Sequence, residues 1–174
     1  CAMHALSRDG QCKTFDASAD GFGRSEACGA IVVQAVNGGE EVEDICVHAE
    51  VCGTGVNQDG KSASFMAPNG PSQEAVIRAA MAQSAALDVV EAHGTGTALG
   101  DPIEAGSMAA IFLAERSTDP YVAGGYKANG GHAEPGAGLA GVLKLLMQLS
   151  DLTMSPNAHL RTLNPYVLDR LRGY

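Results

Sequence analysis

The chain has 174 residues, 45% of them hydrophobic and 18% charged. This length and composition suit one domain with a buried core and exclude a disordered or fibrous protein. Lys and Arg number 11 against 20 Asp and Glu, for a net charge of -9. An acidic chain without a basic cluster disfavours a nucleic-acid partner. No apolar run is long enough to span a bilayer, so we expect neither a membrane partner nor a signal peptide.

The five cysteines, at positions 1, 12, 28, 46 and 52, form no CxxC pair and are odd in number. They predict neither a disulfide framework nor a zinc site, and they favour a reducing, cytoplasmic compartment. Cys28 and Cys46 lie in apolar runs, where we expect inert core thiols. The chain opens without an initiator methionine, and we expect it to be a piece of a longer protein.

The first half of the chain alternates polar loops with short apolar runs. Residues 12–24 are polar and punctuated by glycine, which predicts a loop, with one interpretation placing it near an entrance. Two β-branched runs predict buried strands at 27–36 and 45–49. A second long loop is expected over 56–71, and long ordered loops are often functional.

The second half of the chain predicts alternating helices and strands. Ser72 suits the N-cap of the first helix and Asp101 that of the second, where Pro102 fits the first turn. We expect helices at 73–86, 101–114 and 136–149, strands at 87–90 and 121–125, and a last strand-like piece before the segment 157–166. The order β, β, α, β, α, β, α predicts a layered α/β fold.

Two histidines occupy equivalent positions, each after a predicted strand and before a predicted helix. His93 follows the strand at 87–90, and His132 ends a tight glycine loop, 127–132. Adjacent parallel strands are roughly 5 Å apart, so we expect both rings at one spot. Two imidazoles there can donate hydrogen bonds to an oxygen that develops negative charge, or serve as general acid and base.

Polar neighbours of the histidines extend this interpretation. Thr95 and Thr97 offer hydroxyls to an elongated polar substrate, and Lys127 either pairs with Glu104 or tunes the histidines electrostatically. The alternative is that the histidines only satisfy backbone carbonyls, but their matched placement favours a function. The histidine spacing fits no metal motif such as HExxH, so no catalytic metal is predicted, and the Gly-Thr-Gly-Thr turn fits no nucleotide-binding motif.

Most of the chain resembles the β-ketoacyl synthase (ketosynthase) domain of modular type I polyketide synthases, in the thiolase superfamily. The matching stretches are CKTFDASADGFGR (12–24), VNQDGKSASFMAPNGPSQEAVIRAA (56–80), VVEAHGTGTALGDPIEAG (89–106), KANGGHAEPGAGLAGVLK (127–144) and NAHLRTLNP (157–165). The resemblance implies a thiolase-like, layered α-β-α-β-α fold. Residues 1–174 would form a partial ketosynthase domain from the rear, C-terminal portion of that fold.

The resemblance implies an acyltransferase that extends a polyketide chain by decarboxylative Claisen condensation. An acyl chain passes from the phosphopantetheine of an acyl carrier protein to a cysteine, and a carrier-bound malonyl-type extender loses CO2 and attacks it. The implied partners are the carrier protein, neighbouring synthase domains and a second copy in a homodimer. No cofactor is implied to bind the domain itself.

Individual roles follow from the matching motifs. The histidine of EAHGTGT falls on His93 and that of KxNxGH on His132, and both are implied to stabilise the thioester enolate. The motif lysine falls on Lys127. The GTGT threonines, Thr95 and Thr97, are implied to contact the pantetheine arm. Structural support is expected from Glu104, the implied carboxylate partner of the motif lysine, and from Asp101 and Asn129.

Two departures from the family pattern matter. The nucleophilic cysteine of the family lies in a DTACSS-type segment that does not occur here, and Cys1 does not match it. We therefore expect the fragment alone to be inactive. Gly130 stands where the family usually has a larger apolar residue, which predicts a looser loop.

Three other functions stay open. Two are synthases: a fatty acid synthase condensing domain, and a decarboxylating loading ketosynthase that has glutamine in place of the cysteine. The third is a non-catalytic, chain-length-factor-like structural partner. The retained His93, His132 and Lys127 argue against a purely structural partner, because a scaffold does not need them.

Overall fold

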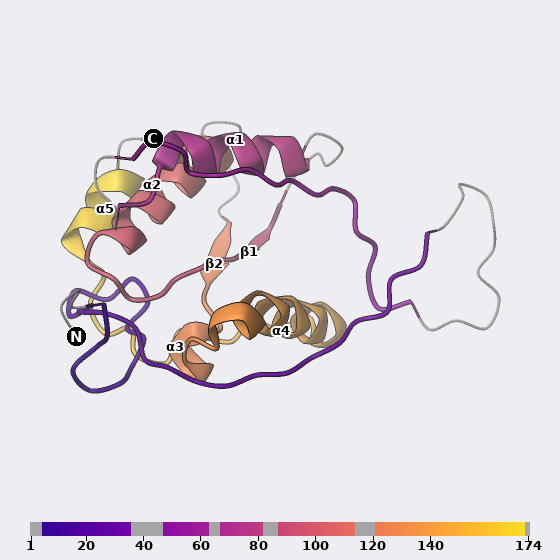
Figure 1. Cartoon of the computed structure of the whole chain (residues 1–174), viewed down its shortest axis with the longest axis horizontal. Helices are drawn as coiled ribbons and strands as arrows, with labels where there is room; N and C mark the ends of the chain where they lie inside the picture. Colours follow the sequence, from indigo (N-terminus) through magenta and orange to yellow (C-terminus); the bar gives the residue numbers. More distant parts are fainter. Residues whose placement is uncertain (1–4, 36–46, 63–66, 82–86, 114–120, 173–174) are drawn as a thin grey trace.

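The computed structural model describes residues 5–35, 47–62, 67–81, 87–113 and 121–172. In Figure 1 two short strands lie between a layer of three helices, α1, α2 and α5, and a second layer formed by α3 and α4. This arrangement confirms the predicted α/β class. The elements in chain order are α1 (Gly70–Met81), β1 (Val89–Glu91), α2 (Gly100–Phe112), β2 (Val122–Gly124), α3 (Lys127–Gly130), the 3-10 helix η1 (Glu134–Gly136), α4 (Ala137–Asp151) and α5 (Pro165–Leu171).

The two strands are parallel, so their carboxyl ends meet at one edge of the sheet. Val89 is paired with Val122, and Glu91 with Gly124. The ladder continues one step further, because the Ala92 N–H donates to the Gly124 carbonyl at 2.7 Å. A parallel pair needs a crossover connection, which α2 provides here.

The core lies where α2 packs between α1 and α5. Each large apolar side chain buried there stabilises the fold by about 1.5–3 kcal/mol. Among the described residues, no helix is both long and apolar enough to cross a membrane. The buried members of the core are Phe15, Ala92, Ala105, Met108, Ile111, Phe112 and Val167.

Both predicted helix caps were wrong, although both helices form. The Asn69 side chain accepts the Ser72 N–H at 3.3 Å, so α1 begins three residues early and Ser72 lies inside it. Residues 82–86 of the predicted helix lie outside the described residues. Leu99 holds the N-cap position of α2, and Asp101 lies within its first turn. The Asp101 carboxylate instead accepts N–H groups from the turn before the helix and from Phe15 in the loop at 12–24, and local spacing does not reveal the second contact.

The strands predicted at 27–36 and 45–49 do not form in the described residues. Residues 27–35 and 47–49 are exposed and unpaired with any strand, and Val32 is 99% exposed. A β-branched run favours an extended backbone, but a strand forms only where a second extended segment pairs with it. Residue 36 and residues 45–46 lie outside the described part. Cys28 is exposed, so the expectation of a core thiol there was wrong, and Cys46 is not described.

The carboxyl-terminal region also differs from the prediction. No strand follows α4 in the described residues; the helix ends with Leu152 in the left-handed conformation at a φ of 52°. Helix α5 was not predicted, although its signal was present: the Asn164 side chain caps it by accepting the Tyr166 N–H at 3.0 Å, and Pro165 follows. The predicted glycine loop at 127–132 begins as a single helical turn, α3.

Candidate active site

His93 and His132 meet at the carboxyl edge of the sheet. The centroids of their rings are 5.4 Å apart, and the ring planes are 89° apart. His93 follows β1 by two residues, whereas His132 is reached from β2 through α3 and Gly131, which has a φ of 77°. The predicted convergence of the two rings is thereby confirmed.

The loop at 12–24 holds His132 from the other side. The His132 N–H donates to the Gly23 carbonyl at 2.7 Å, and the His132 carbonyl accepts the Ser25 N–H at 3.0 Å. The Phe22 ring lies edge-on to the imidazole, with centroids 5.1 Å apart. The two hydrogen bonds fix the backbone of His132, and the Phe22 ring restricts the orientation of the imidazole. The loop at 12–24 therefore lies next to His132, and the interpretation that it lies near an entrance stays a prediction.

Glu104 holds the turn that carries His93. One carboxylate oxygen accepts the His93 N–H at 2.5 Å and the other accepts the Gly94 N–H at 2.8 Å. Burial raises the pKa of Glu104, while these two hydrogen bonds and the charge of Lys127 lower it. Lys127, the expected partner of this carboxylate, acts on Glu104 through its charge, while the hydrogen bonds of Glu104 go to the backbone of the histidine turn.

Asp101 ties the same turn to the loop at 12–24. Its buried carboxylate accepts the N–H groups of Gly96 at 3.1 Å and Thr97 at 3.2 Å, and that of Phe15 at 2.8 Å. The Thr14 hydroxyl adds a bond to the Gly94 carbonyl at 2.6 Å. Burial raises the pKa of Asp101, and the three hydrogen bonds oppose this change. Glu104 and Asp101 thus fix the backbone of the whole turn.

The buried Lys127 contributes to the charge state of the histidines. Its side chain is only 4% exposed, and burial lowers its pKa while Glu104 and Glu91 raise it. Although His93 is partly exposed, burial, the Lys127 charge and His132 lower its pKa to about 4. Burial and Lys127 also lower the pKa of His132. Both rings are therefore neutral at pH 7.

The hydrogen bond at the His132 ring selects its tautomer. Nδ1 of His132 accepts the backbone N–H of Glu134 at 3.2 Å. A nitrogen that accepts carries no proton, so the proton of the neutral ring lies on Nε2. The opposite side of the ring is therefore a hydrogen-bond donor.

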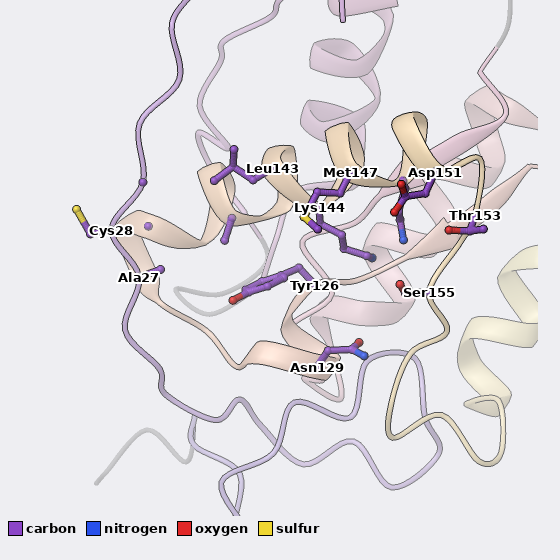
Figure 2. A pocket seen from close by; sticks show the side chains of 14 residues that line it. Ala27, Cys28, Tyr126, Asn129, Leu143, Lys144, Met147, Asp151, Thr153 and Ser155 are labelled. Carbon is purple, nitrogen blue, oxygen red and sulfur yellow. The ribbon is translucent and has the colours of Figure 1, made fainter. Parts of the chain in front are cut away.

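The remaining predicted residues divide into two groups. The hydroxyls of Thr95 and Thr97 lie 3.3 Å apart on the histidine turn, with Thr95 buried and Thr97 half-buried. Asn129 is exposed and lines a different cavity, of about 480 Å³, beside α4 (Figure 2). That larger cavity contains neither histidine. Asn129 is thus separated from the pocket described next.

A smaller pocket of about 210 Å³ contains both His93 and Lys127. Its far wall is α4, which contributes Ala137, Gly138 and Gly141. These small residues leave space next to the imidazole that larger side chains would fill. Within the described residues, no three His, Cys, Asp or Glu side chains gather closely enough to hold a metal ion.

Gly130 does not leave a gap. A Cβ atom there would lie 2.5 Å from Cζ and Oη of Tyr126, so the tyrosine ring already fills the space of a larger residue. The expected loosening of the loop therefore lacks support in the packing. Tyr126 was missed because its ring packs across one turn of α3, a segment predicted to be a loop.

An ion pair beside the site also escaped prediction. Glu91 at the end of β1 lies 2.7 Å from Lys144 of α4, and both side chains are largely buried. Lys144 lies in the middle of α4, 53 positions from Glu91, so no local pattern indicated the contact.

The profile described as "Beta-ketoacyl synthase, C-terminal domain" matches residues 48–161. The chain belongs to the β-ketoacyl synthase family. The profile of the N-terminal domain of that family matches residues 1–37. This ketosynthase chain therefore carries parts of both family domains.

Relatives and solved structures agree with this assignment. The chain is 45% identical over 168 residues to one subunit of the phenolphthiocerol/phthiocerol polyketide synthase of Mycobacterium tuberculosis, covering 94% of this chain and 9% of the relative. It is also 45% identical over 169 residues to erythronolide synthase EryA2 of Saccharopolyspora erythraea, covering 95% of this chain and 5% of that protein.

Among solved structures, an oxazolomycin ketosynthase domain of Streptomyces albus matches with a TM-score of 0.82 and 32% identity over 95% of this chain and 30% of that one. A bacillaene synthase ketosynthase of Bacillus subtilis matches with a TM-score of 0.80 and 30% identity, with the same coverage. The implied thiolase-like fold is confirmed. The chain spans under a tenth of these curated relatives and about 30% of the solved chains.

Proposed function

We propose that this chain supplies the two-histidine part of a ketosynthase that extends a polyketide by decarboxylative Claisen condensation. The observation that carries the proposal is the pair of neutral, converging imidazoles at His93 and His132. The names of the relatives support polyketide rather than fatty acid synthesis.

In the first step a malonyl-type thioester loses CO2. The bond between the α-carbon and the carboxylate breaks, and its electron pair moves toward the thioester oxygen, which becomes an enolate. The Nε2–H of His132 and the ring of His93 stabilise that oxygen, because donors that are already in place need no rearrangement when the negative charge forms. Lys127 supports this step because its charge adds to the effect of burial in lowering the pKa of both rings.

In the second step the α-carbon attacks the carbonyl of an acyl-cysteine. A carbon–carbon bond forms, the carbon–sulfur bond breaks, and the cysteine leaves as a thiolate. The family carries this cysteine on a segment that does not occur in these 174 residues. Cys12 is unsuited to the role, because it is 1% exposed, its thiol contacts Gly23, and burial raises its pKa.

The substrates would arrive on the phosphopantetheine of an acyl carrier protein. The hydroxyls of Thr95 and Thr97 lie on the histidine turn, which suits contact with the polar amides of the pantetheine arm. Neighbouring synthase domains and a second ketosynthase copy are the further partners that the family implies. In this proposal the two threonines bind the pantetheine arm and the two histidines stabilise the negative charge of the enolate. No resident cofactor takes part.

The test is CO2 release from a malonyl-loaded acyl carrier protein by the full-length protein and its histidine variants. His132→Ala should lose about 10²–10³-fold in rate, the effect of removing one oxyanion donor. His48→Ala is the matched control, because His48 is exposed. Unchanged CO2 release in His132→Ala would contradict the proposal.

Mass spectrometry after incubation with an acyl-loaded carrier separates the alternatives. An acyl adduct together with CO2 release indicates a chain-extending synthase. CO2 release without an adduct indicates a loading ketosynthase. The absence of both the adduct and CO2 release would indicate a structural partner.

A further inference from the structure

The carboxylate of Glu91 joins three elements at the back of the site. Its Oε2 lies 2.7 Å from Nζ of Lys144 on α4, and its Oε1 accepts the backbone N–H of Tyr126, the N-cap residue of α3. The side chains of Glu91 and Lys144 are 10% and 13% exposed. Figure 2 shows Lys144 and Tyr126 on the walls of the same cavity, one from α4 and the other from the start of α3.

The residues next to this junction are those of the candidate active site. Glu91 precedes His93 by two positions, and Tyr126 directly precedes Lys127. From there the chain reaches His132 through the single turn of α3. A shift of the junction would therefore move Lys127 and His132 relative to His93.

Two glycines leave the space that the ion pair occupies. A Cβ atom at Gly141 would lie 3.0 Å from Cγ of Glu91, and one at Gly124 would lie 3.2 Å from Nζ of Lys144. A buried ion pair adds little net stability, because losing water from both charges offsets their attraction. Stability alone therefore does not account for a pair built into this position.

The charge of Glu91 also reaches the site. It favours the protonated form of Lys127, together with Glu104, against the effect of burial on the lysine pKa. Burial lowers the pKa of both histidines, and the charge of Lys127 lowers it further. Lys144, on α4, neutralises the negative charge of the Glu91 carboxylate.

We propose that Glu91 and Lys144 are positioning residues that set the separation of His93 and His132 by holding β1, the start of α3 and α4 together. This inference rests on the proposed function. Glu91 lines the pocket that contains His93 and Lys127, and we assign the pair a role through the backbone of Tyr126 and through α4 rather than at the reacting atoms. Displacements of about 1 Å at a catalytic pair can reduce the rate about 10²-fold, so small movements suffice.

The test is the rate of CO2 release from malonyl-loaded carrier protein by full-length variants. Lys144→Met removes the charge at similar length and should lower kcat about 10- to 100-fold, with KM within about twofold. Lys144→Arg keeps the charge and should recover most of kcat. Lys61→Met is the control for loss of a lysine charge, because Lys61 is exposed and lies away from this junction.

The double variant Glu91→Gln with Lys144→Met separates positioning from folding. It removes both charges, so it should fold even if a single variant does not, and Gln still accepts the Tyr126 N–H. Because the link to α4 is lost, kcat should stay low while the melting temperature recovers.

Two results would overturn the positioning role: kcat that recovers together with stability in the double variant, or kcat within about twofold of wild type in Lys144→Met. Loss of rate in His132→Ala alongside either result would leave the proposed function standing. An unchanged rate in His132→Ala would contradict the proposed function itself.

Discussion

The backbone N–H of Glu134 donates to Nδ1 of His132, two residues earlier in the chain. The bond lies in the turn that opens η1, so the local backbone, not a distant side chain, selects the tautomer of this ring. Its donor side stays free to meet a developing negative charge. The low pKa of the ring, caused by burial and by Lys127, keeps it neutral.

The depressed pKa of His93 makes stability depend on pH. Its folded value is about 4 against an ordinary 6.5, so the unfolded chain binds the proton more tightly between these values. This ring therefore lowers the free energy of unfolding as pH falls from about 6.5 toward 4. We expect the free energy of unfolding in urea to fall more between about pH 7 and about pH 4.5 for the wild type than for His93→Gln.

A companion variant checks the source of that shift. Lys127→Met removes the positive charge that lowers the pKa of His93, so the pH-dependent difference should shrink. An equal difference with and without Lys127 would contradict the electrostatic cause.

Glu104 should be required for the geometry of the histidine turn. Glu104→Ala leaves the N–H groups of His93 and Gly94 without their acceptor, which should destabilise the fold by about 1–3 kcal/mol and reduce CO2 release. Glu104→Gln keeps one acceptor oxygen and should lose less of both. Thermal melting and CO2 release measured on both variants would test this, and equal losses would argue against it.

Gly94 should tolerate no side chain while Thr14 keeps its methyl group. Its φ of 49° is left-handed, and a Cβ atom would lie 2.6 Å from Cγ2 of Thr14. Gly94→Ala should lower stability by about 1–2 kcal/mol from the backbone alone, and more from the clash. Combining it with Thr14→Ser, which keeps the hydroxyl, should recover the clash component. Additive losses in a urea double-mutant cycle would contradict this contact.

Tyr126 and Gly130 should behave as a packing pair. Gly130→Ile alone forces a side chain into the tyrosine ring and should cost about 1–3 kcal/mol. With Tyr126→Ala the space reopens, so the double variant should be more stable than Gly130→Ile alone. Melting temperatures of the four proteins in the cycle measure this coupling, and a double variant less stable than either single one would refute it.

The sequence predicted the features that depend on residues close together in the chain, and it missed those that depend on distant residues. The convergence of His93 and His132 followed from two strand ends and one parallel pairing, each with a local signal. Asp101 was placed at the N-cap because its partner Phe15 lies 86 positions away in the chain. The exposed run around Val32 was predicted to be buried because β-branched residues specify an extended backbone, not the segment that covers it.

The site residues divide in the same way. Lys127, Thr95 and Thr97 were predicted as site residues, because each lies within a short recognisable motif. Glu91 and Lys144 escaped it, since a contact over 53 positions between a strand and a helix has no sequence period.

The parallel register of β1 and β2 has a consequence for how the chain can vary in length. Val89 faces Val122, so the spacing of the two histidine-bearing turns depends on the hydrogen-bond ladder and not on the number of residues between the strands. Residues added where α2 leads into β2 would lengthen a connection at little entropic cost. One residue added within either strand would instead displace a turn by about 3.3 Å and separate the rings. Tolerance of insertions is thus concentrated in the crossover, and the strands permit almost none.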